Sequence, residues 1–119
     1  MNEIPNRNLR RPAAPKLPRS WRNRMLRDLE SILGVVPPVF SAPRMRVLKV
    51  GIKHDMVAHY GADPEKVDAW LRKWTSSGWY LLALSRKRHR HDLNGNDVDL
   101  IAVKHREHAG RMLKPAFPR

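Results

Sequence analysis

The segment that follows Asp63-Pro64 constrains the fold more than any other part of the sequence. An acidic residue before a proline is typical of a helix start, because the carboxylate accepts free N–H groups and proline suits the first helical position. Four apolar residues then follow at positions i, i+3, i+4 and i+7 of one helix face, namely Val67, Trp70, Leu71 and Trp74. The spacing predicts an amphipathic helix that ends near residues 75–78.

Apolar residues at helical spacing predict three further helices, at 21 or 23 to 33, at 48 or 49 to 61, and at about 102 to 113. The apolar face of the second of these is expected to comprise Val50, Ile52, Met56, Val57 and Tyr60. The apolar segment 79–84 fits either a short helix, with Ser77 as its N-cap, or a buried strand. Asn94-Gly95 is typical of a two-residue hairpin turn, so we expect a small β-hairpin with Val98 and Leu100 on the return strand. The sequence thus predicts a mainly α, compact single domain of about five helices with a small β-hairpin.

The N-terminal segment 1–24 is expected to form a flexible, basic, proline-rich tail. Its prolines interrupt any helical pattern and are Pro5, Pro12, Pro15 and Pro18. The folded domain is expected over residues 25–114, with a short C-terminal tail at 115–119. A chain of 119 residues has room for one domain of this kind.

Charge gives the strongest indication of a partner. Twenty-four Lys and Arg residues against 11 Asp and Glu residues give a formal net charge of +13. Residues 1–30 carry eight basic and three acidic side chains, so most of the excess lies in the expected domain. Nucleic acid is the leading partner for such a chain, and an anionic membrane surface or an acidic protein are the alternatives.

Several other classes of function are not expected. The chain has no cysteine, which excludes disulfides, a thiol nucleophile and thiolate metal sites. No apolar stretch is long enough for a transmembrane span or a signal peptide, so we expect a cytoplasmic protein without a membrane partner. His105 and His108 lack evident further ligands, and segment 92–99 fails the spacing of a calcium loop, so neither a metal nor a cofactor is expected. Without a nucleotide-binding or nucleophile motif, we expect neither an enzyme nor a small-molecule substrate.

A run of basic residues, 86–90, lies between the aromatic segment and the hairpin turn. Such a run is usually a solvated loop, but guanidinium groups bind phosphates bidentately and aromatic side chains stack on unpaired bases. The preceding helices are expected to add positive charge from Lys49, Lys53, Arg72 and Lys73. We therefore expect this cluster to contact nucleic acid.

Thr75-Ser76-Ser77-Gly78 is expected to be a helix terminus. If it also begins the next helix, its free N–H groups and the positive end of the helix dipole favour a phosphate or a terminal nucleotide. The alternative is that these N–H groups bind only water.

Five sequence blocks, taken in order, resemble the ProQ/FinO domain family. They are RVLKVGI at 46–52, LRKWTSS at 71–77, YL at 80–81, RHDLNG at 90–95 and HREHA at 105–109. Three positions depart from the usual family pattern: Val47 replaces a proline, Trp74 stands where many relatives have tyrosine, and Asn94 replaces an aspartate. The resemblance implies a small, mainly helical domain with a short hairpin.

The resemblance also implies a bacterial RNA chaperone in post-transcriptional regulation. Its relatives favour intrinsic-terminator hairpins of small RNAs and mRNAs that carry a single-stranded, U-rich 3′ end. With the basic cluster included, the expected RNA-binding residues are Lys49, Lys53, Arg72, Lys73, Trp74, Ser76, Ser77, Tyr80, Arg86, Arg88 and Arg90. We expect Lys49, Arg72 and Arg90 to neutralise phosphates and the Ser76-Ser77 end to hold the 3′-terminal nucleotides. Trp74 either stacks on RNA or packs in the core.

Trp21 carries a separate hypothesis, because it is flanked by Arg19, Arg22 and Arg24. An exposed aromatic side chain among arginines could insert at a fraying base pair and promote strand exchange, and the alternative is that Trp21 packs on the domain. We expect a monomer. The rival function is a generic DNA-binding or acidic-protein interaction module that uses the same basic face without 3′-end specificity.

Overall fold

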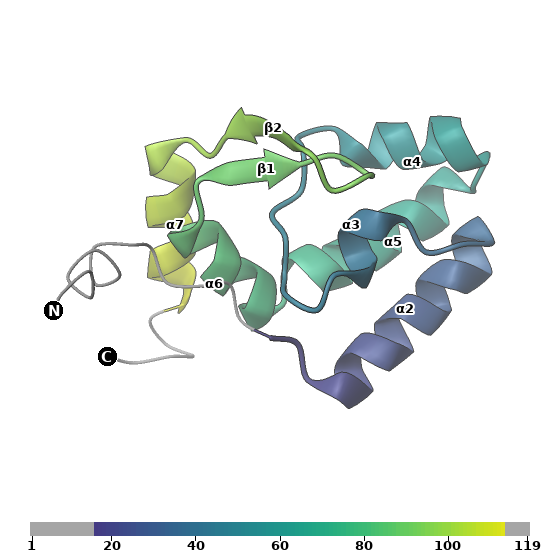
Figure 1. Ribbon diagram of the computed structural model, residues 1–119. Helices are drawn as coiled ribbons and strands as arrows, with labels where there is room; N and C mark the ends of the chain where they lie inside the picture. The colour runs from purple at the N-terminus through teal and green to yellow at the C-terminus, as the bar shows by residue number, and fades with distance from the viewer. Residues whose placement is uncertain (1–15, 114–119) are drawn as a thin grey trace, which may run out of the picture.

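The computed structural model describes residues 16–113, which fold into six helices and one two-stranded sheet (Figure 1). The helices are α2 (Arg19–Leu33), α3 (Pro38–Ser41), α4 (Ile52–Tyr60), α5 (Pro64–Thr75), α6 (Gly78–Arg86) and α7 (Val103–Leu113). The strands β1 (His89–His91) and β2 (Asp97–Leu100) pair antiparallel. The expected mainly helical fold with a small β-hairpin is confirmed. None of the helices in this part of the chain is long and apolar enough to cross a bilayer.

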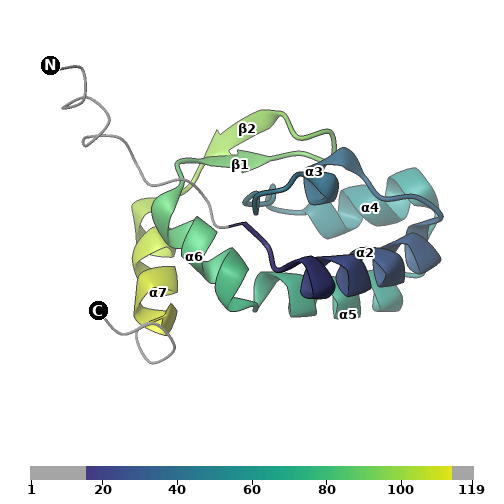
Figure 2. The same cartoon turned by 60° about the horizontal axis from the view of Figure 1, so that its bottom comes forward.

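Helix α5 forms the centre of the core, as its sequence pattern predicts. The Asp63 carboxylate accepts a hydrogen bond from the Glu65 N–H at 2.9 Å and so caps the helix. All four residues of the apolar stripe are buried. Helix α2 lies alongside α5 (Figure 2), and the Trp70 indole N–H donates to the Met25 carbonyl at 2.8 Å, which joins the two helices.

An aromatic cluster packs helix α2 against the core, and this helix begins earlier than the expected end of the tail. The ring of Trp21 stacks on Trp74 at a centroid distance of 5.2 Å, and Trp74 stacks on Trp70 at 4.9 Å. Helix α2 begins at Arg19, so the boundary expected at residue 24 lies inside a helix and is wrong. Pro18 precedes the first helical residue, a position at which proline does not interrupt the helix. Residues 1–15 of the tail expected at 1–24, and the C-terminal tail expected at 115–119, lie outside the described residues.

Helix α4 is shorter than the sequence pattern predicts. It begins at Ile52, after Gly51 at φ +87°, and the segment before it is extended. This segment runs beside β1: the His91 N–H donates to the Val47 carbonyl at 2.7 Å, and the Lys49 N–H donates to the His91 carbonyl at 2.8 Å. Val50 is 69% exposed, so its place on the expected apolar face is wrong.

The apolar segment 79–84 is helical, as one of the two alternatives predicts, and belongs to α6. The hairpin that follows turns differently from expectation. The Gly95 N–H donates to the Asp92 carbonyl at 2.9 Å, and Gly95 adopts φ +88°. A two-residue type I′ turn at Asn94-Gly95 would need a positive φ at Asn94 as well, and no described non-glycine residue has one. The connection is therefore a three-residue loop, 93–95, with glycine at its left-handed position.

Candidate functional site

The peptide of Leu48 is held by two side chains from different elements. Its N–H donates to the Tyr80 hydroxyl oxygen at 3.0 Å, and its carbonyl accepts from Arg90 Nη1 at 2.9 Å. Tyr80 comes from the first turn of α6 and Arg90 from β1. These bonds fix the backbone beside Lys49, so the extended segment, α6 and β1 meet at this point.

Tyr80 supports the site from the interior of the protein rather than from its surface. The residue is 5% exposed, and this burial raises the pKa of its hydroxyl above the ordinary value. Its ring is therefore not available to stack on a base, although the sequence places Tyr80 among the expected RNA-binding residues. Its role in the site is to position Leu48.

Arg90 connects the site to the last helix. Its Nη2 lies 3.3 Å from Nδ1 of His105 on α7. A guanidinium has five N–H donors, more than these contacts use, so the half-buried Arg90 retains donors for an anion. His105 belongs to the HREHA block, but no local sequence pattern indicates that it faces Arg90.

Lys49 is paired with an acidic side chain. Its Nζ lies 2.8 Å from Oδ2 of Asp55 on α4, and this hydrogen bond raises the lysine pKa. Lys49 therefore stays protonated at neutral pH, and its side chain is still 38% exposed. Asp55 holds the ammonium group in place while it offsets part of its charge.

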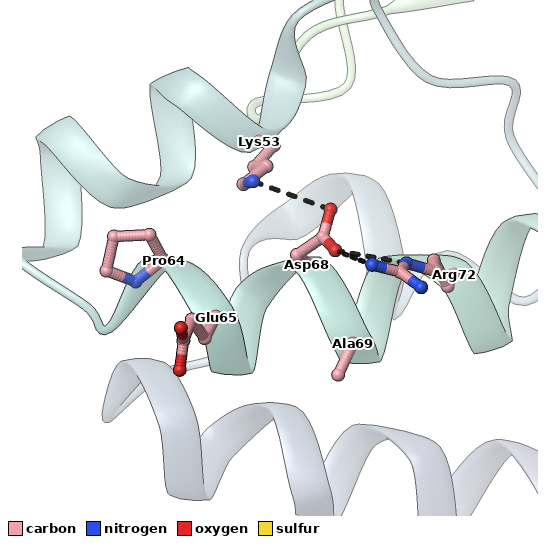
Figure 3. Close-up of a pocket in the computed structure, with 6 residues that line it drawn as sticks. All are labelled: Lys53, Pro64, Glu65, Asp68, Ala69 and Arg72. Carbon is pink, nitrogen blue, oxygen red and sulfur yellow. Dashed lines mark hydrogen bonds and ion pairs between the residues drawn. The ribbon is translucent and has the colours of Figure 1, made fainter.

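Two other expected RNA-binding residues share one carboxylate. Asp68 Oδ1 lies 3.4 Å from Lys53 Nζ, and Asp68 Oδ2 lies 2.6 Å from Arg72 Nη2 (Figure 3). The hydrogen bond from Arg72 is the main cause that lowers the pKa of Asp68. The trio lines an open pocket of about 500 Å³ between α4 and α5. The i, i+4 spacing of Asp68 and Arg72 is the signal that could have revealed this pairing.

The helix end at Ser76-Ser77 is present as expected. Ser76 ends α5, and Ser77 is the N-cap of α6. The Ser77 hydroxyl accepts from the Tyr80 N–H at 3.1 Å and donates to the Trp74 carbonyl at 2.8 Å, so it is used within the protein. The first turn still presents the N–H groups of Gly78 and Trp79, which precede the first intrahelical bond.

The remaining expected site residues are placed as follows. Trp74 is 2% exposed and lies in the core, so the alternative that it stacks on RNA is wrong. Lys73, Arg86 and Arg88 are exposed. Arg19, Trp21, Arg22 and Arg24 all lie in α2, where the half-buried Trp21 packs against Trp74 and Arg22 donates to the Ser41 carbonyl. Packing on the domain is thus the correct alternative for Trp21. Within residues 16–113, no three His, Asp or Glu side chains are grouped to hold a metal ion.

Comparison with known proteins identifies the family. The profile of the ProQ/FinO family matches residues 28–118. The chain belongs to the ProQ/FinO family. It is 38% identical over 77 residues to the RNA chaperone ProQ of Aeromonas salmonicida, an alignment that covers 60% of this chain and 36% of that protein. This ProQ/FinO chain therefore spans about a third of the length of that curated relative.

Two solved structures have a similar ProQ/FinO fold. A FinO-like RNA chaperone from Neisseria meningitidis superimposes with a TM-score of 0.60 at 19% identity, over 83% of this chain and 81% of that one. The solution structure of a ProQ homolog from Legionella pneumophila gives a TM-score of 0.56 at 16% identity, over 88% and 90% of the two chains. At such low identity these similarities support the fold alone.

Proposed function

We propose that this chain is an RNA chaperone that binds structured RNA. Its membership of the ProQ/FinO family, the RNA chaperone activity named for one relative and one structural neighbour, and a net charge of +13 support this function. Phosphate neutralisation by Lys and Arg supplies most of the affinity in such interactions. Small RNAs and mRNA 3′ ends are the proposed partners, and the chain acts as a monomer in the cytoplasm.

The observation that carries the proposal is the meeting of three elements at Leu48. Tyr80 and Arg90 hold its peptide, Lys49 follows it in the chain, and the first turn of α6 adjoins it through Tyr80. Two cationic side chains and a helix N-terminus therefore surround one fixed backbone position. Each of these groups favours an anionic ligand.

The finer proposal concerns the class of RNA. We propose that the site recognises intrinsic-terminator hairpins with single-stranded, U-rich 3′ ends. The A-form stem would be held by its shape and phosphates through Lys49, Arg72 and other exposed cations. The 3′-terminal nucleotides would lie at the N–H groups of Gly78 and Trp79, beside Arg90. The Ser77 side chain caps the Tyr80 N–H and leaves these two N–H groups to the RNA.

A binding titration at near-physiological salt tests this function. One hairpin is prepared with a U-rich 3′ tail and without it, and a duplex DNA of the same stem length is the third ligand. We expect the tailed hairpin to bind at least tenfold more tightly than either, and Arg90→Ala to remove this preference. Lys66→Ala, which removes an exposed positive charge on α5 away from Leu48, is the control and should keep the preference. Equal binding of all three ligands would favour the rival generic module.

A further inference from the structure

A second basic pocket lies at the other end of helix α6. It has a volume of about 330 Å³ and is lined by segment 42–46, by Lys87 at the end of α6 and by His91 of β1. We call it the Lys87 pocket. Its volume is at the lower end of the range of ligand sites, which suits one nucleotide rather than a large molecule.

The Lys87 pocket differs in charge from the other two cavities described. Among residues 16–113, its lining includes Arg44, Arg46 and Lys87 and no carboxylate. In contrast, Glu65 and Asp68 line the cavity between α4 and α5, and Asp55 and Asp92 line the cavity beside Lys49. His91 of this lining lies beside the carboxylate of Asp97, whose Oδ1 is 3.1 Å from His91 Nε2 and whose side chain is 62% exposed.

The pocket is held in shape by hydrogen bonds to the backbone. Arg46 Nη1 donates to the Gly95 carbonyl at 2.9 Å, and His91 Nδ1 lies 3.0 Å from the Val47 carbonyl. These bonds leave further guanidinium donors of Arg46 for an anion. Ala42 and Pro43, which are not buried, supply apolar wall against which a sugar or base can pack.

The Lys87 pocket is separate from the Leu48 site. Arg90 and His91 are consecutive on β1, and consecutive strand residues point to opposite faces. Arg90 is directed to Leu48 and His105, whereas His91 is directed to Val47 and Asp97. Ser77 and Lys87 cap the two ends of the nine-residue helix α6, about 15 Å apart at ~1.5 Å per residue.

We propose that the Lys87 pocket is a second RNA subsite, which binds a backbone phosphate of the same RNA whose 3′ end lies at the Leu48 site. Arg46 and Lys87, in a lining whose described residues include no carboxylate, provide the charge for a phosphodiester, and the apolar wall provides contact for its nucleoside. This inference rests on the proposed function. It adds a contact that the five family-like blocks do not supply, because Arg44 and Lys87 lie outside them.

The first test compares two single-charge variants of the full chain. Lys87→Ala removes a pocket lysine, and Lys66→Ala removes an exposed lysine that lines none of the three cavities. For the tailed hairpin we expect Lys87→Ala to weaken binding by about tenfold, against about twofold or less for Lys66→Ala. The slope of log K against log salt should fall by about 0.7 to 1 for Lys87→Ala.

The second test locates the RNA contact on the protein by NMR of the methionine methyl groups. Both methionines are buried, but Met45 lines the pocket, whereas Met25 of α2 lines none of the three cavities and is the internal control. The tailed hairpin should shift the Met45 methyl signal in the wild type and in Lys66→Ala, and not in Lys87→Ala. Equal affinity and equal salt slope of the two variants would overturn the subsite. Failure of the wild type to prefer the tailed hairpin would instead overturn the proposed function.

Discussion

The hydroxyl of Tyr80 accepts a hydrogen bond from the backbone N–H of Leu48 at 3.0 Å, inside the protein and between residues 32 positions apart. Because Arg90 donates a hydrogen bond to the Leu48 carbonyl, both backbone polar groups of this buried residue are bonded to side chains. The arrangement places Lys49 and Arg90 without making Tyr80 part of the exposed surface.

Tyr80→Phe should therefore affect stability first. It leaves the buried Leu48 N–H without a partner, which costs about 1 to 3 kcal/mol of unfolding free energy. For a domain of this size we expect the Tm to fall by roughly 5 to 15 °C, measured by circular dichroism. A variant with unchanged Tm and much weaker RNA binding would show that the hydroxyl contacts RNA directly.

Asp68→Asn should strengthen RNA binding. The carboxylate pairs with both Lys53 and Arg72, so an RNA phosphate has to compete with it for these cations. We expect affinity for a tailed hairpin to rise about threefold and the salt slope to increase by about 1. Glu65→Gln, which neutralises another acid of the same pocket, is the control and should have a smaller effect. Weaker binding by Asp68→Asn would mean that Asp68 orients the two cations for RNA.

Asp92→Asn should reduce the loss of stability in acid. Hydrogen bonds from the Asn96 backbone N–H and its neighbours lower the pKa of Asp92 below its ordinary value near 3.8. A depressed pKa adds stability above that ordinary value, and this contribution is lost as the pH falls through the lower folded-state pKa. The drop in Tm between about pH 5 and about pH 2.5 should be smaller in Asp92→Asn than in the wild type. An equal drop in both proteins would contradict the assignment.

Trp21→Ala should destabilise the fold, because Trp21 stacks on Trp74 and links α2 to the core. The side chain is half-buried, so we expect a loss of about 2 kcal/mol, less than for a fully buried tryptophan. Trp21→Phe keeps an aromatic ring and should recover much of this stability. If Trp21→Ala kept its Tm but lost strand-exchange activity in an RNA annealing assay, the packing role would be wrong.

The helices with strong local signals were predictable from the sequence. Boundaries that depend on long-range strand pairing were not. Helix α5 has a capping acid, a proline at N1 and a complete apolar stripe, so its bounds agree with expectation. The predicted start of α4 was wrong because Val47 and Leu48 have an apolar pattern that a helix would also show. Their extended form depends on pairing with β1, more than 40 residues later, which no local pattern reveals.

The candidate site shows the same division. The Ser77 cap and the basic residues around it follow from local sequence and the family-like blocks. Trp74 and Tyr80 are buried because residues of α2 and of segment 44–49 pack in the same core, and these contacts are tertiary. The sequence alone therefore could not decide whether Trp74 stacks on RNA or packs in the core. The pairing of Lys53 with Asp68 across α4 and α5 is likewise a tertiary contact.

Recognition of the RNA 3′ end is the central claim, and one titration tests it most directly. The same tailed hairpin is compared with a free 3′ hydroxyl and with a 3′ phosphate, at near-physiological salt, for the wild type and for Ser76→Ala. We predict that the 3′ phosphate weakens wild-type binding by at least tenfold, because the added phosphate crowds and repels the last backbone phosphate, which the N–H groups at the start of α6 already hold. Equal affinity for both hairpins would contradict recognition of the 3′ end and leave only binding by charge.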